Sequence, residues 1–155
     1  TRNRLSSTKD ALNNNNTINY DANGNITYIN LPNGQRVNFS YDNINRVTGM
    51  SDISGTIGNY TYDRNNNITS YTNGTGAITT ATYDSLNRIK KITDPLGFFT
   101  LLSYDKNDNI VSATDRNGAV INYTYDSLNR VKTFTDKNGF VITVDYDAEG
   151  NVTQA

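Results

Sequence analysis

The sequence has no Cys, no His and no Trp in 155 residues, and only one Met and two Pro. Without Cys and His the chain has no disulfides, no thiol nucleophile, no zinc site of the usual kind and no His-based triad. The net charge is -1, so the chain lacks the basic surface that binds nucleic acid or anionic membranes. No apolar run is long enough for membrane insertion, and no signal peptide is visible at the start.

The residues that are abundant favour strands and turns. Tyr occurs 11 times and Gly 11 times, and about one residue in six is Asn. Asn, Gly and Asp are turn formers, whereas Thr, Tyr, Val and Ile prefer strands. The composition therefore predicts an all-β chain with many turns.

A Tyr-Asp pair recurs at one constant interval with no insertion or deletion, which is the mark of a repeat architecture. The pairs are Tyr20-Asp21, Tyr41-Asp42, Tyr62-Asp63, Tyr83-Asp84, Tyr104-Asp105, Tyr125-Asp126 and Tyr146-Asp147. We predict one array over residues 1–155. Its parts are a truncated first repeat at 1–19, full repeats at 20–40, 41–61, 62–82, 83–103, 104–124 and 125–145, and a truncated last repeat at 146–155. Because both ends cut through repeats, we expect a piece of a longer array.

Each repeat has two turn signals, counted here from Tyr as position zero. Position four holds only Gly, Asn or Asp, the residues that tolerate positive φ. Position fourteen is Gly in the six full repeats, and a turn that accepts Gly is the simplest account. These glycines are Gly34, Gly55, Gly76, Gly97, Gly118 and Gly139. The segments between the signals predict antiparallel β-hairpins, stacked side by side into a curved, spiral, open sheet.

The second strand of each hairpin has an irregular pattern. Position six is always Ile or Val, and position nine is apolar in every full repeat, as in Val131 and Phe134. A spacing of three breaks strict alternation, so either a β-bulge restores the face or the strand is partly buried on both sides.

A second period, twice as long as the first, underlies it. Position five alternates without exception: Arg4, Asn25, Arg46, Asn67, Arg88, Asn109, Arg130 and Asn151. Position three alternates with it, since Ile44, Leu86 and Leu128 accompany Arg. We expect the Leu/Ile-x-Arg turns to pack on a neighbour, with Arg over a Tyr ring or near an Asp, and the Asn turns to face solvent. Leu86 should then be more buried than Asn107.

The pattern Tyr-Asp-x-x-Gly/Asn-Asn/Arg-Ile/Val, followed by Thr-Asp-x-x-Gly as in Thr135-Asp136-Lys137-Asn138-Gly139, resembles the YD repeat. This Rhs repeat family includes Rhs proteins, wall-associated proteins, Tc toxin C components and teneurins. The resemblance covers nearly the whole chain. It implies β-hairpins that wind into a shell, which in toxins encloses a C-terminal effector and in teneurins belongs to an adhesion ectodomain.

The resemblance implies a non-catalytic structural segment of a larger bacterial protein that is secreted or displayed at the cell surface. Its expected partners are the rest of the parent array and an enclosed effector domain. The motif Asp94-Pro95-Leu96-Gly97 is similar to the Asp-Pro-x-Gly-Leu element at which Rhs shells cleave themselves. Phe98 follows where Leu is required, however, and the motif lies at an ordinary turn position, so we interpret it as a turn.

Other functions remain open at this point. A carbohydrate-binding or adhesion surface would use exposed Tyr and Asn, with Tyr28 and Tyr71 as candidate ligand-facing residues. A calcium site would use the position-eleven carboxylates of Asp52, Asp94, Asp115 and Asp136 together with those of the Tyr-Asp pairs, although no known calcium motif appears. No catalytic, cofactor-binding or metal-binding residues are predicted. The cut ends of such a sheet predict end-to-end self-association.

Overall fold

The computed structural model describes residues 4–154, and within that range it contains strands and no helix. The strands are β1 (Ser7–Lys9), β2 (Asn15–Tyr20), β3 (Ile26–Asn30), β4 (Arg36–Tyr41), β5 (Val47–Asp52), β6 (Gly55–Tyr62), β7 (Ile68–Asn73), β8 (Ile78–Tyr83), β9 (Ile89–Thr93), β10 (Phe99–Tyr104), β11 (Ile110–Thr114), β12 (Val120–Tyr125), β13 (Val131–Thr135), β14 (Val141–Thr143), β15 (Asp145–Tyr146) and β16 (Val152–Gln154). The prediction of an all-β chain is confirmed.

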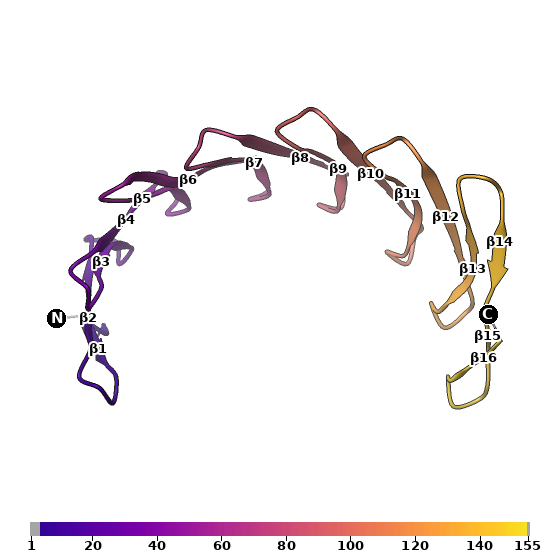
Figure 1. Cartoon of the computed structure of the whole chain (residues 1–155), viewed down its shortest axis with the longest axis horizontal. Coiled ribbons are helices and arrows are strands. Elements are labelled where there is room, and N and C mark those ends of the chain that lie inside the picture. The colour runs from indigo at the N-terminus through magenta and orange to yellow at the C-terminus, as the bar shows by residue number, and fades with distance from the viewer. Residues whose placement is uncertain (1–3, 155) are drawn as a thin grey trace. The chain divides into compact units, whose positions relative to one another are not determined.

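The chain forms two compact units, Thr1–Thr79 and Thr80–Ala155, here called unit 1 and unit 2. Within unit 1 the strands β1 to β7 follow chain order, and every neighbouring pair is antiparallel. Unit 2 continues in the same way from β8 to β14, and β15 pairs with β16. Figure 1 shows that each unit's sheet is a succession of hairpins that curves along its length. Each sheet is open, because β1 and β14 have one strand neighbour each among the described residues.

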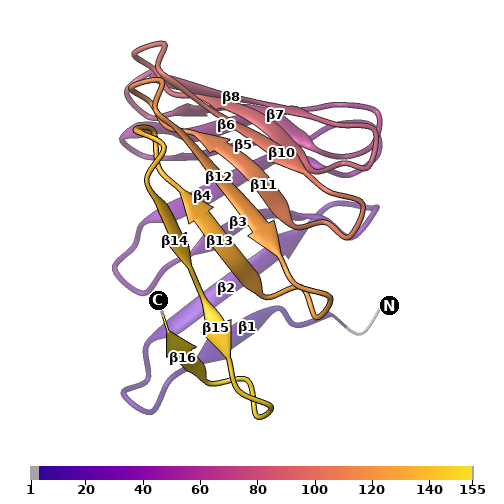
Figure 2. The ribbon, with the colours of Figure 1, turned by 90° about the vertical axis from the view of Figure 1, so that its right-hand side faces the viewer.

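Each unit is a single layer of strands with no second layer on either face, as β10 to β13 show in Figure 2. No apolar side chain in the described range is fully buried. The most covered side chains lie on the face that carries the repeat tyrosines: in β12, for example, Ile121, Tyr123 and Tyr125 are half-buried and the residues between them are exposed. Stability in such a fold comes from contacts between neighbouring strands rather than from a core.

A β-bulge resolves the irregular spacing of positions six and nine. In β12 and β13, Tyr125 pairs with Val131 but Thr124 pairs with Thr133, so Lys132 is an extra residue. The same shift at position seven recurs in all seven Tyr-Asp hairpins. The bulge returns position nine to the face of the tyrosines, where Phe134 lies opposite Tyr123 with ring centroids 5.7 Å apart. Of the two alternatives, the bulge is correct.

Candidate functional site

The turns after the Tyr-Asp pairs lie at the strand ends on one side of each sheet. This row of turns is called here the Tyr-Asp rim. The aspartate of each turn fixes the loop through its own carboxylate. In the turn 42–46, Asp42 Oδ1 accepts the backbone N–H groups of Ile44 (3.0 Å) and Arg46 (2.9 Å). Asn45 then adopts a φ of 66°, and every described position-four residue likewise has positive φ. The prediction of a left-handed residue at position four is confirmed, and the Asp acts as the acceptor of an Asx-type turn.

The repeat tyrosines connect each repeat to the one before it. The hydroxyl groups donate to the backbone carbonyl oxygen fifteen residues earlier, at position six of the preceding repeat. The pairs are Tyr20–Leu5, Tyr41–Ile26, Tyr62–Val47, Tyr104–Ile89, Tyr125–Ile110 and Tyr146–Val131, at 2.7–2.9 Å. Ile110, for example, lies beyond the residues at which β11 pairs with β12, which begin at Ser112, so the Tyr125 hydroxyl joins the two strands where they form no ladder pair.

The arginines of position five join two neighbouring turns. Arg88 Nε donates to Asp84 Oδ2 in its own turn (2.7 Å), while Nη1 donates to the carbonyl oxygen of Asp105 (3.0 Å) and to Asp108 Oδ1 (2.7 Å) in the next turn. Its guanidinium lies 4.5 Å from the centroid of the Tyr104 ring. The same stacking joins Arg4 to Tyr20, Arg46 to Tyr62 and Arg130 to Tyr146. The expectation that Arg lies over a Tyr ring and near an Asp is confirmed.

In the turns that have Asn at position five, the Asn makes the corresponding contacts. Asn109 Nδ2 donates to Asp105 Oδ2 (3.0 Å) in its own turn and to Asn129 Oδ1 (2.9 Å) in the next. Asn25 reaches Asn45 in the same way at 2.7 Å. Position four therefore has two roles when it is Asn or Asp: its backbone forms the left-handed turn, and its side chain accepts a hydrogen bond from the preceding turn.

These contacts hold the rim carboxylates in the charged form. The pKa values of all seven Tyr-Asp carboxyls are lowered below the ordinary 3.8. In the turns with Asn at position five the main cause is the amide of that Asn, as Asn109 does for Asp105. In the turns with Arg it is the backbone N–H of the Arg, as Arg130 does for Asp126. The same rim raises the pKa of Arg88, first through its bond to Asp84.

The expectation that the Leu/Ile-x-Arg turns bury their apolar residue is wrong. Leu86 is 64% exposed and Leu128 is 69% exposed, and Asn107 is exposed as well. The arginine extends along the rim to the tyrosine of the next repeat, but the residue two positions before it lies at the tip of the turn. The tip projects beyond the strand ends, where a single-layer sheet has nothing to cover it.

The two tyrosines proposed as ligand-facing lie on strands and are half-buried. Tyr28, in β3, lies under the guanidinium of Arg36, which is 4.0 Å from its ring centroid. Tyr71, in β7, lies beside Tyr60 with ring centroids 5.2 Å apart. A Cβ atom at Gly58 would come within 2.7 Å of the Tyr71 ring, so that ring covers Gly58. The two residues are not brought together into one site.

The opposite ends of the strands form the Gly rim, whose turns repeat the chemistry of the Tyr-Asp rim. Asp115 Oδ1 accepts the N–H groups of Asn117 and Ala119, both at 2.8 Å, and Gly118 takes the positive φ of 80°. Asp94, Asp136 and Asp10 act in the same way. The segment Asp94-Pro95-Leu96-Gly97 is thus an ordinary turn of this rim. No group of three or more potential metal-ligating side chains occurs within residues 4–154.

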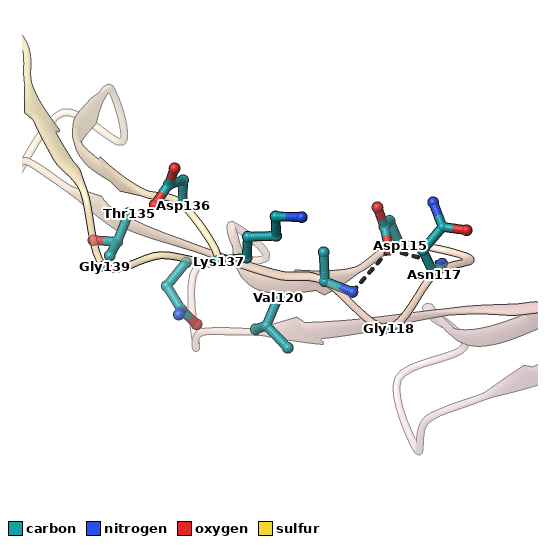
Figure 3. A pocket seen from close by; sticks show the side chains of 10 residues that line it. Asp115, Asn117, Gly118, Val120, Thr135, Asp136, Lys137 and Gly139 are labelled. Carbon is teal, nitrogen blue, oxygen red and sulfur yellow. Dashed lines mark hydrogen bonds between the residues drawn. The ribbon is translucent and has the colours of Figure 1, made fainter.

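A polar groove lies between two turns of the Gly rim in unit 2, with a volume of about 590 Å³. Its walls are the turns that begin at Asp115 and Asp136, and Val120, Asn122 and Thr135 come from the adjoining strands. Figure 3 shows Lys137 extending from its turn into the space between them. The lining offers carboxylate, amide, hydroxyl and ammonium groups to a polar ligand.

Sequence reasoning missed this groove and one further contact on the same rim. Arg116 lies 3.4 Å from the Asp94 carboxylate and 4.6 Å from the centroid of the Phe98 ring. Arg116 therefore joins two turns of the Gly rim as Arg88 does on the other. It occupies position twelve, which is not Arg in any other repeat, so the repeat pattern did not predict this contact. The only available signal was its separation from Asp94, which is just over one repeat length and places it one turn further along the rim.

Comparison with known proteins agrees with this architecture. A family model described as Teneurin YD-shell matches residues 3–95, and one described as RHS Repeat matches residues 104–141 and 125–155. The solved Photorhabdus luminescens Tc holotoxin pore with the mutation TccC3-D651A is 19% identical, with a TM-score of 0.73 over 90% of this chain. The TcdB2-TccC3-TEV structure is 11% identical, with a TM-score of 0.75 over 94% of this chain. This chain spans 9% of each of those chains. No curated protein sequence matches it.

Hairpins of constant length, whose neighbouring turns are linked along one rim by Tyr, Asp and Arg, define a YD-repeat array. The chain belongs to the teneurin YD-shell family, because that family's model covers more than half of it. The family predicted from the repeats is confirmed.

Proposed function

We propose that this chain is a non-catalytic segment of a β-shell or spacer in a larger bacterial protein that is secreted or displayed at the surface. In that role it would enclose an effector or display an adhesion module, and its partners would be the rest of the parent array and the enclosed domain. The observation that carries the proposal is the hydrogen bond from repeat tyrosines such as Tyr62, Tyr104 and Tyr125 to the carbonyl fifteen residues earlier. Through this bond the tyrosine, which recurs at a constant interval, joins one repeat to the next.

The rims support a structural role for the carboxylates as well. Each Tyr-Asp carboxylate accepts backbone amides of its turn, and its lowered pKa keeps it charged as a permanent acceptor. A general acid or base near neutral pH needs the opposite shift, toward the operating pH. No helix within residues 4–154 is long and apolar enough to cross a membrane.

The test of the enclosing role uses the intact product of the parent gene. Limited proteolysis should leave the segment that follows the array protected in the intact protein. Weakening the wall by Tyr104→Phe and Tyr125→Phe should speed cleavage of that segment. Cleavage of the segment as fast as that of the same segment expressed alone would rule out enclosure.

End-to-end self-association follows from the open edge of β1. Ile18 N–H donates to the carbonyl of Ser6, and antiparallel pairs alternate, so the amides of Ser7 and Lys9 face the open side of β1. A strand of a second copy can pair there. Ser7→Pro removes one of these amides and should reduce association in sedimentation velocity. A wild-type chain that stays monomeric at all concentrations would refute it.

A second candidate function, carbohydrate binding, is favoured by the polar groove of unit 2. Small-molecule sites combine a few placed polar groups with apolar surface, and the groove combines Asp136, Lys137 and Asn122 with Val120. A glycan array would show binding that is lost in Lys137→Ala and retained in Lys9→Ala, which lies outside the groove. Loss only in Tyr28→Ala or Tyr71→Ala would place the glycan on the sheet instead, and no binding would remove this candidate.

A further inference from the structure

One turn of the Gly rim in unit 1 carries Asn where the equivalent turns carry Asp. Asn73 occupies position eleven of its repeat and is followed by Gly74. Position eleven is Asp in four other repeats, at Asp52, Asp94, Asp115 and Asp136. The chain has four further Asn-Gly pairs, and their Asn lies at position three or thirteen instead. These pairs are Asn23-Gly24, Asn33-Gly34, Asn117-Gly118 and Asn138-Gly139.

The side-chain oxygen of Asn73 accepts three hydrogen bonds. Thr75 donates its backbone N–H to Asn73 Oδ1 at 3.0 Å and its hydroxyl at 2.7 Å, and Ala77 donates its N–H at 2.9 Å. Asp115 accepts the corresponding two backbone groups in its own turn. A carboxylate is inert there, but the Cγ carbon of an amide can be attacked by a nucleophile. Donors that already point at Oδ1 stabilise the negative charge that such an attack places on it.

The backbone nitrogen of Gly74 is a nucleophile next to this carbon. An Asx-type turn folds the side chain back over the following peptide group, which here joins Asn73 to Gly74. Gly74 N–H donates no hydrogen bond to a described residue. In the other four Asn-Gly pairs the Gly N–H closes its turn, and that bond must break before the nitrogen can react. The closing bonds are Gly24–Asp21, Gly34–Leu31, Gly118–Asp115 and Gly139–Asp136, at 3.0–3.2 Å.

The packing around Gly74 keeps this nitrogen accessible. A Cβ atom at Gly74 would lie 2.5 Å from the carbonyl oxygen of Thr56, a backbone atom that cannot move aside cheaply. A larger residue, whose side chain would shield the nitrogen, is therefore excluded at this position. Gly74 is exposed, so water and hydroxide reach the peptide group.

We propose that Asn73 is a site of spontaneous deamidation. Gly74 N gives its proton to hydroxide and attacks Asn73 Cγ. The N–Cγ bond forms, the Cγ–Nδ2 bond breaks, and Nδ2 takes a proton from water and leaves as ammonia. Water then opens the cyclic imide at either carbonyl and yields Asp or isoaspartate. The Asp product has the acceptor that Asp94 and Asp115 supply in their own turns, so the turn accommodates it and gains a negative charge.

Peptide mapping by mass spectrometry follows all five Asn-Gly pairs in one sample of the folded chain. In mildly alkaline buffer, Asn73 should convert to the acid roughly five to ten times faster than the other four, which must first break a turn hydrogen bond. Incubation in urea provides the control, because it removes the turns and leaves five pairs of the same two residues. Their rates should then be alike.

Two variants of Thr75 test the role of the donors to Oδ1. Thr75→Val removes the hydroxyl and should slow the reaction at Asn73 about tenfold, less than in a closed enzyme site because this turn is open to water. Thr75→Ser keeps the hydroxyl and should react like the wild type. Circular dichroism verifies that both variants are folded.

Asn73→Asp tests whether the product fits, and it should melt no lower than the wild type. A lower melting temperature would overturn the accommodation of Asp in this turn. The deamidation site itself is overturned if Asn73 reacts no faster than the other pairs in the folded chain, if it remains the fastest in urea, or if Thr75→Val reacts like the wild type.

Discussion

The hydroxyl of Tyr125 donates a 2.8 Å hydrogen bond to the backbone carbonyl of Ile110, fifteen residues earlier. Tyr125→Phe removes this bond and leaves a partly buried carbonyl without its partner. We expect the free energy of unfolding to fall by about 1 kcal/mol. Urea titration followed by circular dichroism measures the change.

The control for this variant is Tyr123→Phe on the same strand. No described residue accepts a hydrogen bond from the Tyr123 hydroxyl, and its ring contact with Phe134 survives the change. Its stability should match the wild type. Equal losses in the two variants would show that the Tyr125 bond contributes nothing specific.

Asn129 combines a φ of 60° with a side-chain oxygen that accepts from Asn109 and Asn107. Asn129→Ala keeps a Cβ in the left-handed region but loses the short polar side chain that makes Asn tolerant of it, and should cost about 1–2 kcal/mol. Asn129→Gly relieves the backbone and loses only the acceptor, so its stability should lie between the Ala variant and the wild type. Thermal melting of the three proteins checks this order.

The control variant for Asn129→Ala is Asn117→Ala on the Gly rim. There the neighbouring Gly118 adopts the positive φ, so Ala at 117 is not strained. A loss as large as that of Asn129→Ala would mean that the left-handed conformation is not the cause.

Gly58 lies beneath the ring of Tyr71. Gly58→Ala places a methyl group against that ring and should destabilise the sheet by about 1–3 kcal/mol through overpacking. Tyr71→Val in the same chain removes the clash and should restore part of the loss, which a double-mutant cycle measures. Strict additivity of the two changes would contradict direct contact.

Between neutral and acidic pH, stability should change only in acid. The Tyr-Asp carboxyls have lowered pKa values in the folded chain and ordinary values near 3.8 when unfolded. Their stabilisation is therefore present above pH 3.8 and is lost as the pH falls through the folded values. The chain has no His, so the urea midpoint should stay level through neutral pH and drop below about pH 4.

Asp126→Asn provides the matched comparison for that titration. It should lower the midpoint at neutral pH and reduce the acid drop, because one of the responsible carboxylates is gone. An unchanged acid drop in this variant, or a midpoint that already falls near neutral pH, would contradict the assignment to the rim.

The strict period made much of this fold predictable, since Tyr41, Asp42 and Asn45 each mark a position whose backbone role follows from residue type. The bulge could not be chosen from sequence, because the spacing from Val131 to Phe134 fits two arrangements until strand pairing is known. The exposure of Leu86 was mispredicted because an apolar residue at a turn tip has no neighbour inside a single-layer sheet.

The groove of unit 2 was not predictable for a different reason. Asn122 and Thr135 meet only through the pairing of β12 with β13, and Asn122 does not stand out in the repeat pattern. Its lining depends on register and on residues particular to one repeat, which periodicity cannot reveal.

The extra residue at position seven of every hairpin constrains how such a gene can change length. Losing or gaining one residue in a strand would turn all later side chains in that strand to the opposite face, and would misalign the next tyrosine with its carbonyl. Inserting or deleting one whole repeat avoids that, yet it would place two arginines or two asparagines on successive turns. Duplication or loss of two consecutive repeats preserves both patterns, so arrays of this kind should expand and contract in pairs of hairpins.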